Sequence, residues 1–158
     1  MKILSFDQST KVSGYALFNN GEYELSGIVD LSKSGLETYD RSFVMAKELW
    51  KIIKKYSPDK LIIENVQQQS NPSTIIILAR LAGMIIGYSE AHNIPTYILL
   101  PTQWRKALEY SQGAKVKRQE LKKQSINYVK NNFGLELPED QCEAICINVA
   151  AQKIFNFN

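Results

Sequence analysis

Two short apolar runs, at residues 3–6 and 61–63, are each followed at once by an acidic residue. The first run leads into Asp7 and the second into Glu64. Runs of this length are typical of buried strands, and helical patterns lie between and after them. This order predicts an α/β fold in which two parallel strands end side by side, so that both acids lie at one edge of the sheet.

Further patterns complete a mixed five-stranded sheet flanked by helices. The sequence Asn19-Asn20-Gly21 predicts a hairpin turn between strands at 15–18 and 22–29. The other elements are expected as a strand over 96–100 and as helices over about 36–56, 72–93, 117–132 and 138–154. No linker or repeat interrupts the pattern, so residues 1–158 are interpreted as a single domain.

The helix expected from residue 72 is unusual because it is apolar on nearly every side. Asn71 and Pro72 have the residue types of an N-cap and a first helical position. An all-round apolar helix must be buried on more than one face, either inside the monomer or in a dimer. The sequence leaves both possibilities open.

The last predicted helix adds two acids to those at the strand ends. Asp140 and Glu143 are three residues apart and share a face with Ala144, Ile147 and Ala151, which should pack on the sheet. Singly, these acids have simpler explanations, as a turn residue for Asp7, an exposed strand end for Glu64 and a helix N-terminus for Asp140, but together the four predict a site. Carboxylates are the ligands that Mg²⁺ prefers, and a pair of ions about 4 Å apart can promote phosphodiester hydrolysis.

Positive charge is concentrated in one segment. The formal net charge is +3, but residues 101–131 hold eight basic residues against two acidic ones. Lys115, Lys117 and Arg118 lie near a helix start, where cations do not stabilise the helix but phosphate binds well. We therefore expect these three residues and Arg105 to contact DNA phosphates.

The remaining composition argues against a membrane or secreted protein. We expect no apolar run that approaches the ~18 residues needed to span a bilayer, and an acidic residue follows the N-terminus too early for a signal peptide. Cys142 and Cys146 are interpreted as small buried residues, because the single histidine, His92, is too distant in sequence to complete a zinc site. These observations predict a cytoplasmic location.

Three segments resemble the acidic motifs of RuvC-like Holliday junction resolvases, which have the ribonuclease H-like fold. The segments are FDQSTKVSGYALF, LIIENVQQQSNP and DQCEAICINVA. The resemblance implies a homodimer that nicks symmetry-related strands of a four-way DNA junction, using Mg²⁺ or Mn²⁺. It also implies that Asp7, Glu64, Asp140 and Glu143 are the catalytic, metal-binding acids. The small size and atypical motifs resemble those of a bacteriophage member.

The chain departs from the family pattern at two positions. Glu143 stands where bacterial members commonly have aspartate, which lengthens the ligand by one methylene but keeps the carboxylate. Gln67 stands where those members have an aromatic residue that helps to open the junction. Gln67 and Gln68 can still contact DNA backbone or bases, so we expect activity on three-way and fork DNA as well. In the family, basic residues in the region that corresponds to Lys115–Lys123 hold the scissile strand. Lys115 or Lys117 is the candidate for stabilising transition-state charge.

Two other functions are weighed against a nuclease. The run from Asp7 to Thr10, followed by Gly14, also resembles the first phosphate motif of sugar kinases in the actin-like fold. Those enzymes need two such domains, which 158 residues cannot hold. A non-catalytic branched-DNA-binding module would keep the fold without hydrolysis. Retention of all four acids argues against this module, because a buried carboxylate cluster without metal is costly.

Overall fold

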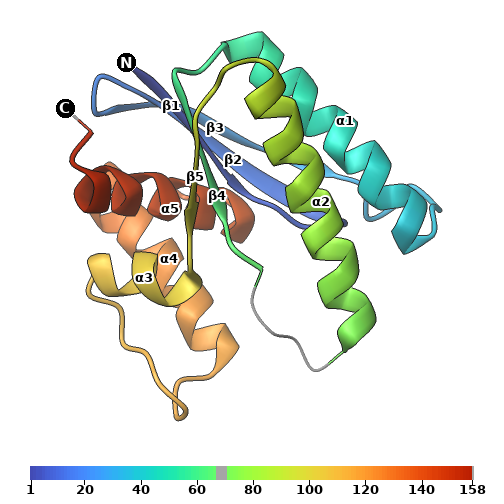
Figure 1. The fold of residues 1–158 in the computed structure, drawn as a ribbon. Helices are drawn as coiled ribbons and strands as arrows, with labels where there is room; N and C mark the ends of the chain where they lie inside the picture. The colour runs from blue at the N-terminus through green and yellow to red at the C-terminus, as the bar shows by residue number, and fades with distance from the viewer. Residues whose placement is uncertain (67–70, 158) are drawn as a thin grey trace.

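A single mixed sheet runs through the computed structural model, with the strand order β3-β2-β1-β4-β5 (Figure 1). The structure describes residues 1–66 and 71–157. The strands are β1 (Lys2–Asp7), β2 (Val12–Asn19), β3 (Glu22–Asp30), β4 (Lys60–Glu64) and β5 (Thr96–Leu99). The first three pair antiparallel, whereas β4 is parallel to both β1 and β5. The predicted mixed five-stranded sheet, with its first and fourth strands as parallel neighbours, is confirmed.

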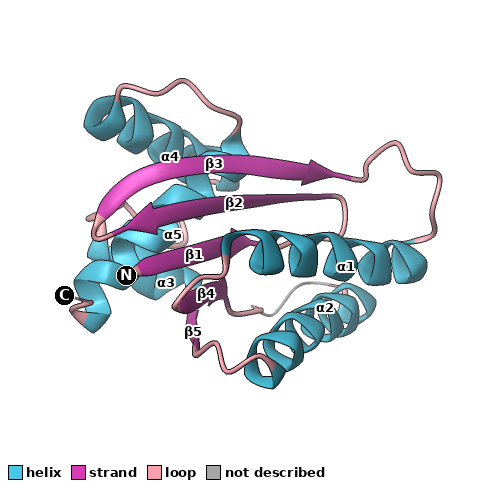
Figure 2. Ribbon diagram, turned by 90° about the horizontal axis from the view of Figure 1, so that it is seen from above, coloured by secondary structure: helices cyan, strands magenta, loops and turns pink. Residues whose placement is uncertain are grey.

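Helices cover both faces of this sheet (Figure 2). On one face lie α1 (Thr38–Tyr56) and α2 (Pro72–Ala91), and on the other lie α3 (Pro101–Ala107), α4 (Arg118–Phe133) and α5 (Glu139–Phe155). Side chains alternate along each strand, so Leu4 and Phe6 pack toward α1 while Ile3 packs toward α5. Each face of the sheet therefore has its own apolar core.

Local signals for turns and helix ends were mostly confirmed, with one helix missed. Asn20 and Gly21 have positive φ angles of 50° and 85°, as the predicted hairpin requires. The Asn71 side chain caps α2 by accepting from the Ser73 N–H at 2.9 Å. The short helix α3 was not predicted. It forms because Pro101 occupies its first turn and the Gln103 side chain accepts from the Leu100 N–H at 2.8 Å.

The apolar helix α2 is only partly covered within the monomer, and it contradicts one expectation. Only Leu81, Ala82, Ile85 and Ser89 are buried, so within the monomer the helix covers its apolar surface on one face only. α2 is also long and apolar enough to cross a bilayer. An 18-residue stretch of this helix has a mean hydropathy of 1.4, and 22% of that stretch is buried. The expectation that no such run exists was wrong. One such helix is weak support for a membrane span, because a packed helix of a globular domain passes the same test.

A buried polar network fixes α5 against the sheet. The Asn148 amide donates to the Ile3 carbonyl oxygen at 3.0 Å and to Ser5 Oγ at 3.1 Å. Ser5 Oγ in turn donates to the carbonyl oxygen of Ala144 at 2.7 Å. Because all of these groups are buried, leaving any of them without a hydrogen-bond partner would be costly. The network therefore fixes the position of α5 along β1. The acids at the start of α5 are placed by this anchoring.

Candidate active site

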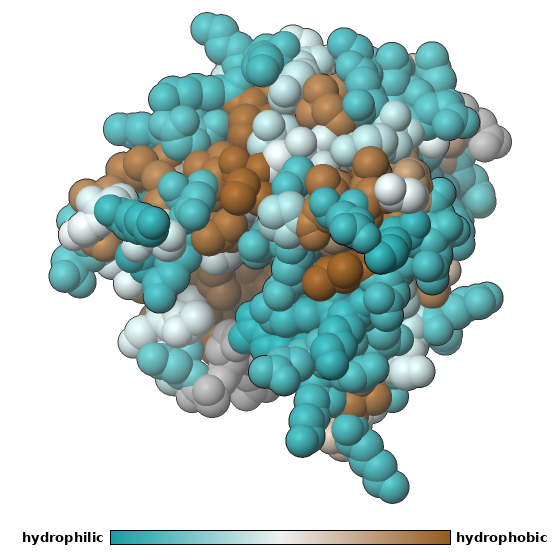
Figure 3. Space-filling view, turned by 180° about the vertical axis from the view of Figure 1, so that it is seen from behind, coloured by the Kyte–Doolittle hydropathy of each residue, from teal (hydrophilic) through white to brown (hydrophobic). Residues whose placement is uncertain are grey.

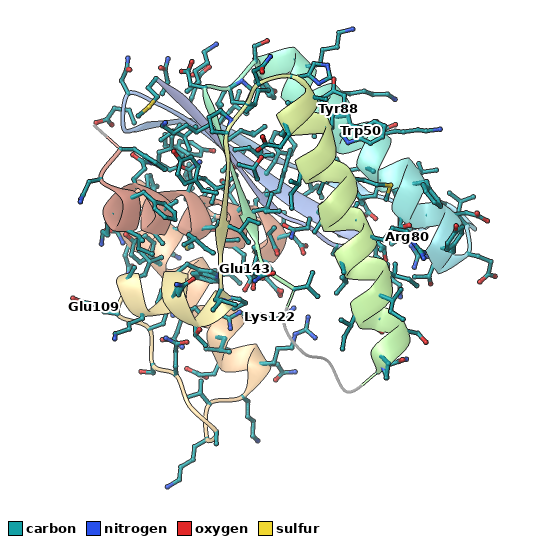
Figure 4. The ribbon with its side chains drawn as sticks, in the orientation of Figure 1. Trp50, Arg80, Tyr88, Glu109, Lys122 and Glu143 are labelled. Atoms are coloured by element: carbon teal, nitrogen blue, oxygen red, sulfur yellow. The ribbon has the colours of Figure 1, made fainter. Side chains whose placement is uncertain are left out.

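The four predicted acids come together at one end of the sheet. Asp7 is the last residue of β1 and Glu64 is the last residue of β4. The parallel register of these strands continues to Phe6 and Ile63, so the two acids follow on neighbouring strands. Asp140 and Glu143 enter from the first turns of α5. Figure 4 shows Glu143 at this end, well away from Trp50 and Tyr88.

Burial and mutual repulsion raise the pKa values of these carboxyl groups. Removal from solvent raises the pKa of Asp7 well above its ordinary value, and the charges of Glu143, Glu64 and Asp140 add to the effect. Burial also raises the pKa of Glu64 to about 7, with Glu143 contributing. The pKa values of Asp140 and Glu143 are raised by burial as well. Repulsion of this kind shows that Asp7 lies within electrostatic reach of the other three acids.

Two arginines oppose this repulsion. The positive charge of Arg105 lowers the pKa values of both Glu64 and Glu143, and that of Arg118 lowers the pKa of Glu64. Arg105 lies at the end of α3, with its guanidinium 4.9 Å from the ring centre of Trp104. Two of the four predicted DNA-contacting cations therefore lie beside the acids.

The other predicted DNA-contacting residues have different outcomes. Lys117 is the N-cap of α4 and Lys115 lies in the preceding loop, and both are exposed to solvent. Neither lysine is among the main charges that shift the pKa values of the four acids. The predicted contacts by Gln67 and Gln68 lie outside the described residues.

The structure adds a lysine that sequence reasoning did not single out. Lys122 of α4 forms an ion pair with Glu139, and its charge lowers the pKa values of Asp140 and Glu143. Lys122 and Glu143 lie close together in Figure 4. The signal was present in the sequence, because residue 122 is one helical turn after Arg118 on the same face.

The residues around Glu64 were also missed. The Gln8 side chain donates from Nε2 to the Glu64 carbonyl oxygen and accepts from the Glu64 N–H at 3.3 Å. Trp104 is fully buried, and its indole N–H lowers the pKa of Glu64. This N–H lies outside hydrogen-bond geometry with every acceptor in the described part of the chain. Nothing in the local sequence pattern indicated that Trp104 would lie beside Glu64.

The donor chemistry of the site fits Mg²⁺. All four side chains offer carboxylate oxygens, and a cation would offset the repulsion that raises their pKa values. Within residues 1–66 and 71–157, no three acidic, histidine or cysteine side chains converge closely enough to form a ready-made metal cage. Repulsion acts over longer distances than the ~2 Å of a metal–oxygen bond, so both observations hold.

The sheet order, the helices on both faces and the acids at the ends of β1, β4 and α5 define the ribonuclease H-like fold. Two solved structures share it. T. thermophilus RuvC in complex with a Holliday junction substrate matches with a TM-score of 0.76 at 13% identity, over 100% of this chain and 96% of that one. The yeast mitochondrial Holliday junction resolvase Ydc2 matches with a TM-score of 0.61 at 18% identity, over 96% and 77%.

Sequence comparison gives the family within this fold. The family model described as crossover junction endodeoxyribonuclease RuvC matches residues 3–150, so the chain belongs to the RuvC family. Curated relatives with that description include one from Syntrophomonas wolfei, 26% identical over 94% of this chain and 87% of the relative. Another, from Fusobacterium nucleatum, is 28% identical over 93% and 77%.

Proposed function

We propose that this chain is a structure-specific DNA endonuclease that cleaves Holliday junctions by metal-dependent phosphodiester hydrolysis. The observation that carries the proposal is the cluster of four acids from β1, β4 and α5, whose carboxyl pKa values are all raised. Such a cluster is costly unless a cation neutralises it. Membership of the RuvC family supports the same chemistry.

In this mechanism Asp7, Glu64, Asp140 and Glu143 would hold two Mg²⁺ ions, for which Mn²⁺ would substitute. When bound, the ions supply an activated water and stabilise the leaving oxygen. Carboxylates bind a cation in their ionised form, so metal binding would release any proton that Glu64 holds because of its raised pKa. Arg105 is the proposed contact to the scissile phosphate, because a guanidinium can form two parallel hydrogen bonds to phosphate oxygens. Its influence on the pKa values of Glu64 and Glu143 supports this role.

The basic start of α4 completes the proposed DNA surface. Lys115, Lys117 and Arg118 are exposed near the N-terminus of this helix, where backbone N–H groups also favour phosphate. Lys115 or Lys117 is the proposed residue that stabilises transition-state charge, and Lys122 joins them as a further contact near Asp140 and Glu143. Gln67 and Gln68, which lie outside the described residues, are proposed to contact DNA backbone or bases.

We further propose that two copies pair through α2. Ile76 is 58% exposed on this apolar helix, and Tyr39 of α1 is 51% exposed. Arg80 of α2 connects this helix to α1, because its guanidinium lies 4.6 Å from the ring centre of Tyr39. On the opposite side of the molecule, Figure 3 shows mostly hydrophilic side chains with separate apolar patches between them. A second copy seated on α2 would cover apolar surface that the monomer leaves open and would present two sites to a junction.

The set of DNA substrates that the protein nicks distinguishes a Holliday junction resolvase from a nuclease that cuts branched DNA in general. We expect nicking of labelled four-way, three-way and fork DNA in Mg²⁺, and little nicking of a linear duplex of the same sequence. Cleavage confined to four-way junctions would contradict the broader specificity. Tight junction binding without nicking, in Mg²⁺ and in Mn²⁺, would favour the non-catalytic binding module. A cytoplasmic location and a bacteriophage source stay predictions.

A further inference from the structure

The carboxamide of Gln8 extends the sheet by one step beyond the end of β1. The backbone pairing between β1 and β4 runs to Phe6 and Ile63. Gln8 then offers its side-chain N–H to the Glu64 carbonyl oxygen, and its side-chain oxygen accepts from the Glu64 N–H at 3.3 Å. A carboxamide carries the same donor and acceptor as a peptide group. It therefore replaces a backbone peptide at the point where β1 turns away.

The other edge of Glu64 is held by β5. Glu64 pairs with Leu99 in the parallel register of β4 and β5, and the Asn65 N–H donates to the Leu99 carbonyl oxygen at 2.8 Å. The main chain at Glu64 thus lies between a backbone partner on one side and the Gln8 side chain on the other. Because Gln8 follows Asp7 directly, its two hydrogen bonds connect the main chain beside one acid to the main chain of another.

We infer that Gln8 is a positioning residue that fixes the separation of Asp7 and Glu64 for metal binding. The inference rests on the proposed function. Two carboxylates that must share a cation repel each other until the cation binds. Without hydrogen bonds between the ends of β1 and β4, this repulsion would move the two strand ends apart. Two hydrogen bonds at the strand ends resist this movement, so the acids are already placed when the ion arrives.

Gln8→Met tests this role, because methionine has similar length but offers neither an amide donor nor a carbonyl acceptor. We expect the Mn²⁺ concentration for half-maximal nicking to rise on the order of 10-fold, the low end for residues that support metal ligands. Junction affinity in EDTA should stay at the wild-type value. The Mn²⁺ concentration that half-saturates the rise in Tm, measured without DNA, should shift by the same factor.

Gln124→Met is the matched control. Gln124 makes the same pair of hydrogen bonds to a main chain, accepting from the Ser111 N–H at 2.8 Å and donating to the Ser111 carbonyl oxygen at 3.0 Å. Ser111 lies in the connection between α3 and α4 and carries none of the four acids. Half-saturation of the Tm shift by Mn²⁺ should therefore match the wild type, even if the unfolding temperature of this variant falls.

The outcomes separate the inference from the proposed function. A folded Gln8→Met protein with the wild-type Mn²⁺ half-saturation overturns the positioning role and leaves the nuclease intact. If this variant does not fold, Gln8→Asn carries the same test, because its carboxamide is one methylene too short to make both bonds. A wild-type protein that never nicks a junction contradicts the proposed function, and the Tm titration then still decides the role of Gln8.

Discussion

A Cβ atom added to Gly14 would lie 1.9 Å from the carbonyl oxygen of Asp140. Gly14 is the residue of β2 that pairs with Asp7 of β1, so the first turn of α5 rests directly on the sheet beside the first acid. No side chain fits between them, and the missing Cβ is what lets the helix backbone come this close. The distance between the acids of α5 and those of the strands therefore depends on a glycine.

Gly14→Ala is expected to move the start of α5 away from the sheet. The contact is to backbone, which cannot swing aside, so we expect a loss of stability of about 1–3 kcal/mol and a larger loss of nicking rate. Thermal unfolding and initial rates on one four-way junction measure the two effects. Gly83→Ala is the control for stability, because its Cβ would meet open space in a helix and should keep or raise Tm. Wild-type activity in Gly14→Ala would contradict the role of this contact.

The metal-free protein should lose stability as the pH rises. The pKa of Glu64 is raised from 4.5 to about 7 in the folded state, so between these values the folded protein binds more protons than the unfolded chain. Its free energy of unfolding therefore falls as the pH rises from about 4.5 to about 7, by an amount on the order of 3 kcal/mol. Urea unfolding in EDTA at pH 5 and pH 8 measures the change.

Glu64→Gln should flatten that pH dependence and be more stable than the wild type at pH 8 in EDTA, because a neutral side chain replaces a repelled carboxylate. Replacing an ordinary exposed glutamate with glutamine would not be expected to raise stability at pH 8 in this way. An equal pH dependence in the two proteins would show that Glu64 titrates normally.

Ile76→Asp should weaken self-association by more than about 10-fold, because the change places a charge in the proposed apolar interface on α2. Sedimentation equilibrium gives the association constant directly. Ile154→Asp is the matched control, since Ile154 is 39% exposed on α5, which covers the other face of the sheet. Equal dissociation of both variants, or a wild type that stays monomeric at high concentration, would count against pairing through α2.

Neutralising Lys115 and Lys117 together with glutamine should weaken junction binding to a similar extent for all sequences. If each lysine contacts one phosphate, the slope of log affinity against log salt should become shallower by about 0.9 for each contact. Fluorescence anisotropy in EDTA gives this slope without cleavage. Lys51→Gln, on α1 and paired with Glu48, should leave the slope unchanged. A wild-type slope in the double variant would remove these lysines from the DNA surface.

The elements that carry the acids could be predicted because their patterns are local. Strand runs ending at Asp7 and Glu64, and the apolar stripe behind Asp140, need no tertiary information. The hydrogen bonds between Gln8 and Glu64 could not be predicted, because they join residues 56 apart and depend on the register of β1 and β4. The approach of Asp140 to Gly14 likewise depends on where α5 crosses the sheet, which the buried contacts of Asn148 decide.

The short helix α3 shows a different limit. Seven residues with a proline at the start give too little periodicity for a helix to be predicted, and the helix forms around the buried indole of Trp104. The apolar pattern of α2 predicted burial on several faces, but the monomer buries one face only. Periodicity reports that a surface must be covered and does not say by which chain.

The most direct test is the initial nicking rate of a labelled four-way junction across Mn²⁺ concentrations, for the wild type and Glu64→Gln. Bound metal contributes several kcal/mol to the transition state, so removing one ligand should cost at least about 100-fold in rate. We expect nicking by the wild type that requires Mn²⁺ and vanishes in EDTA, with Glu64→Gln below about one hundredth of that rate while still binding the junction. Nicking that persists in EDTA, or in Glu64→Gln at the wild-type rate, would contradict a metal-dependent site built on these acids.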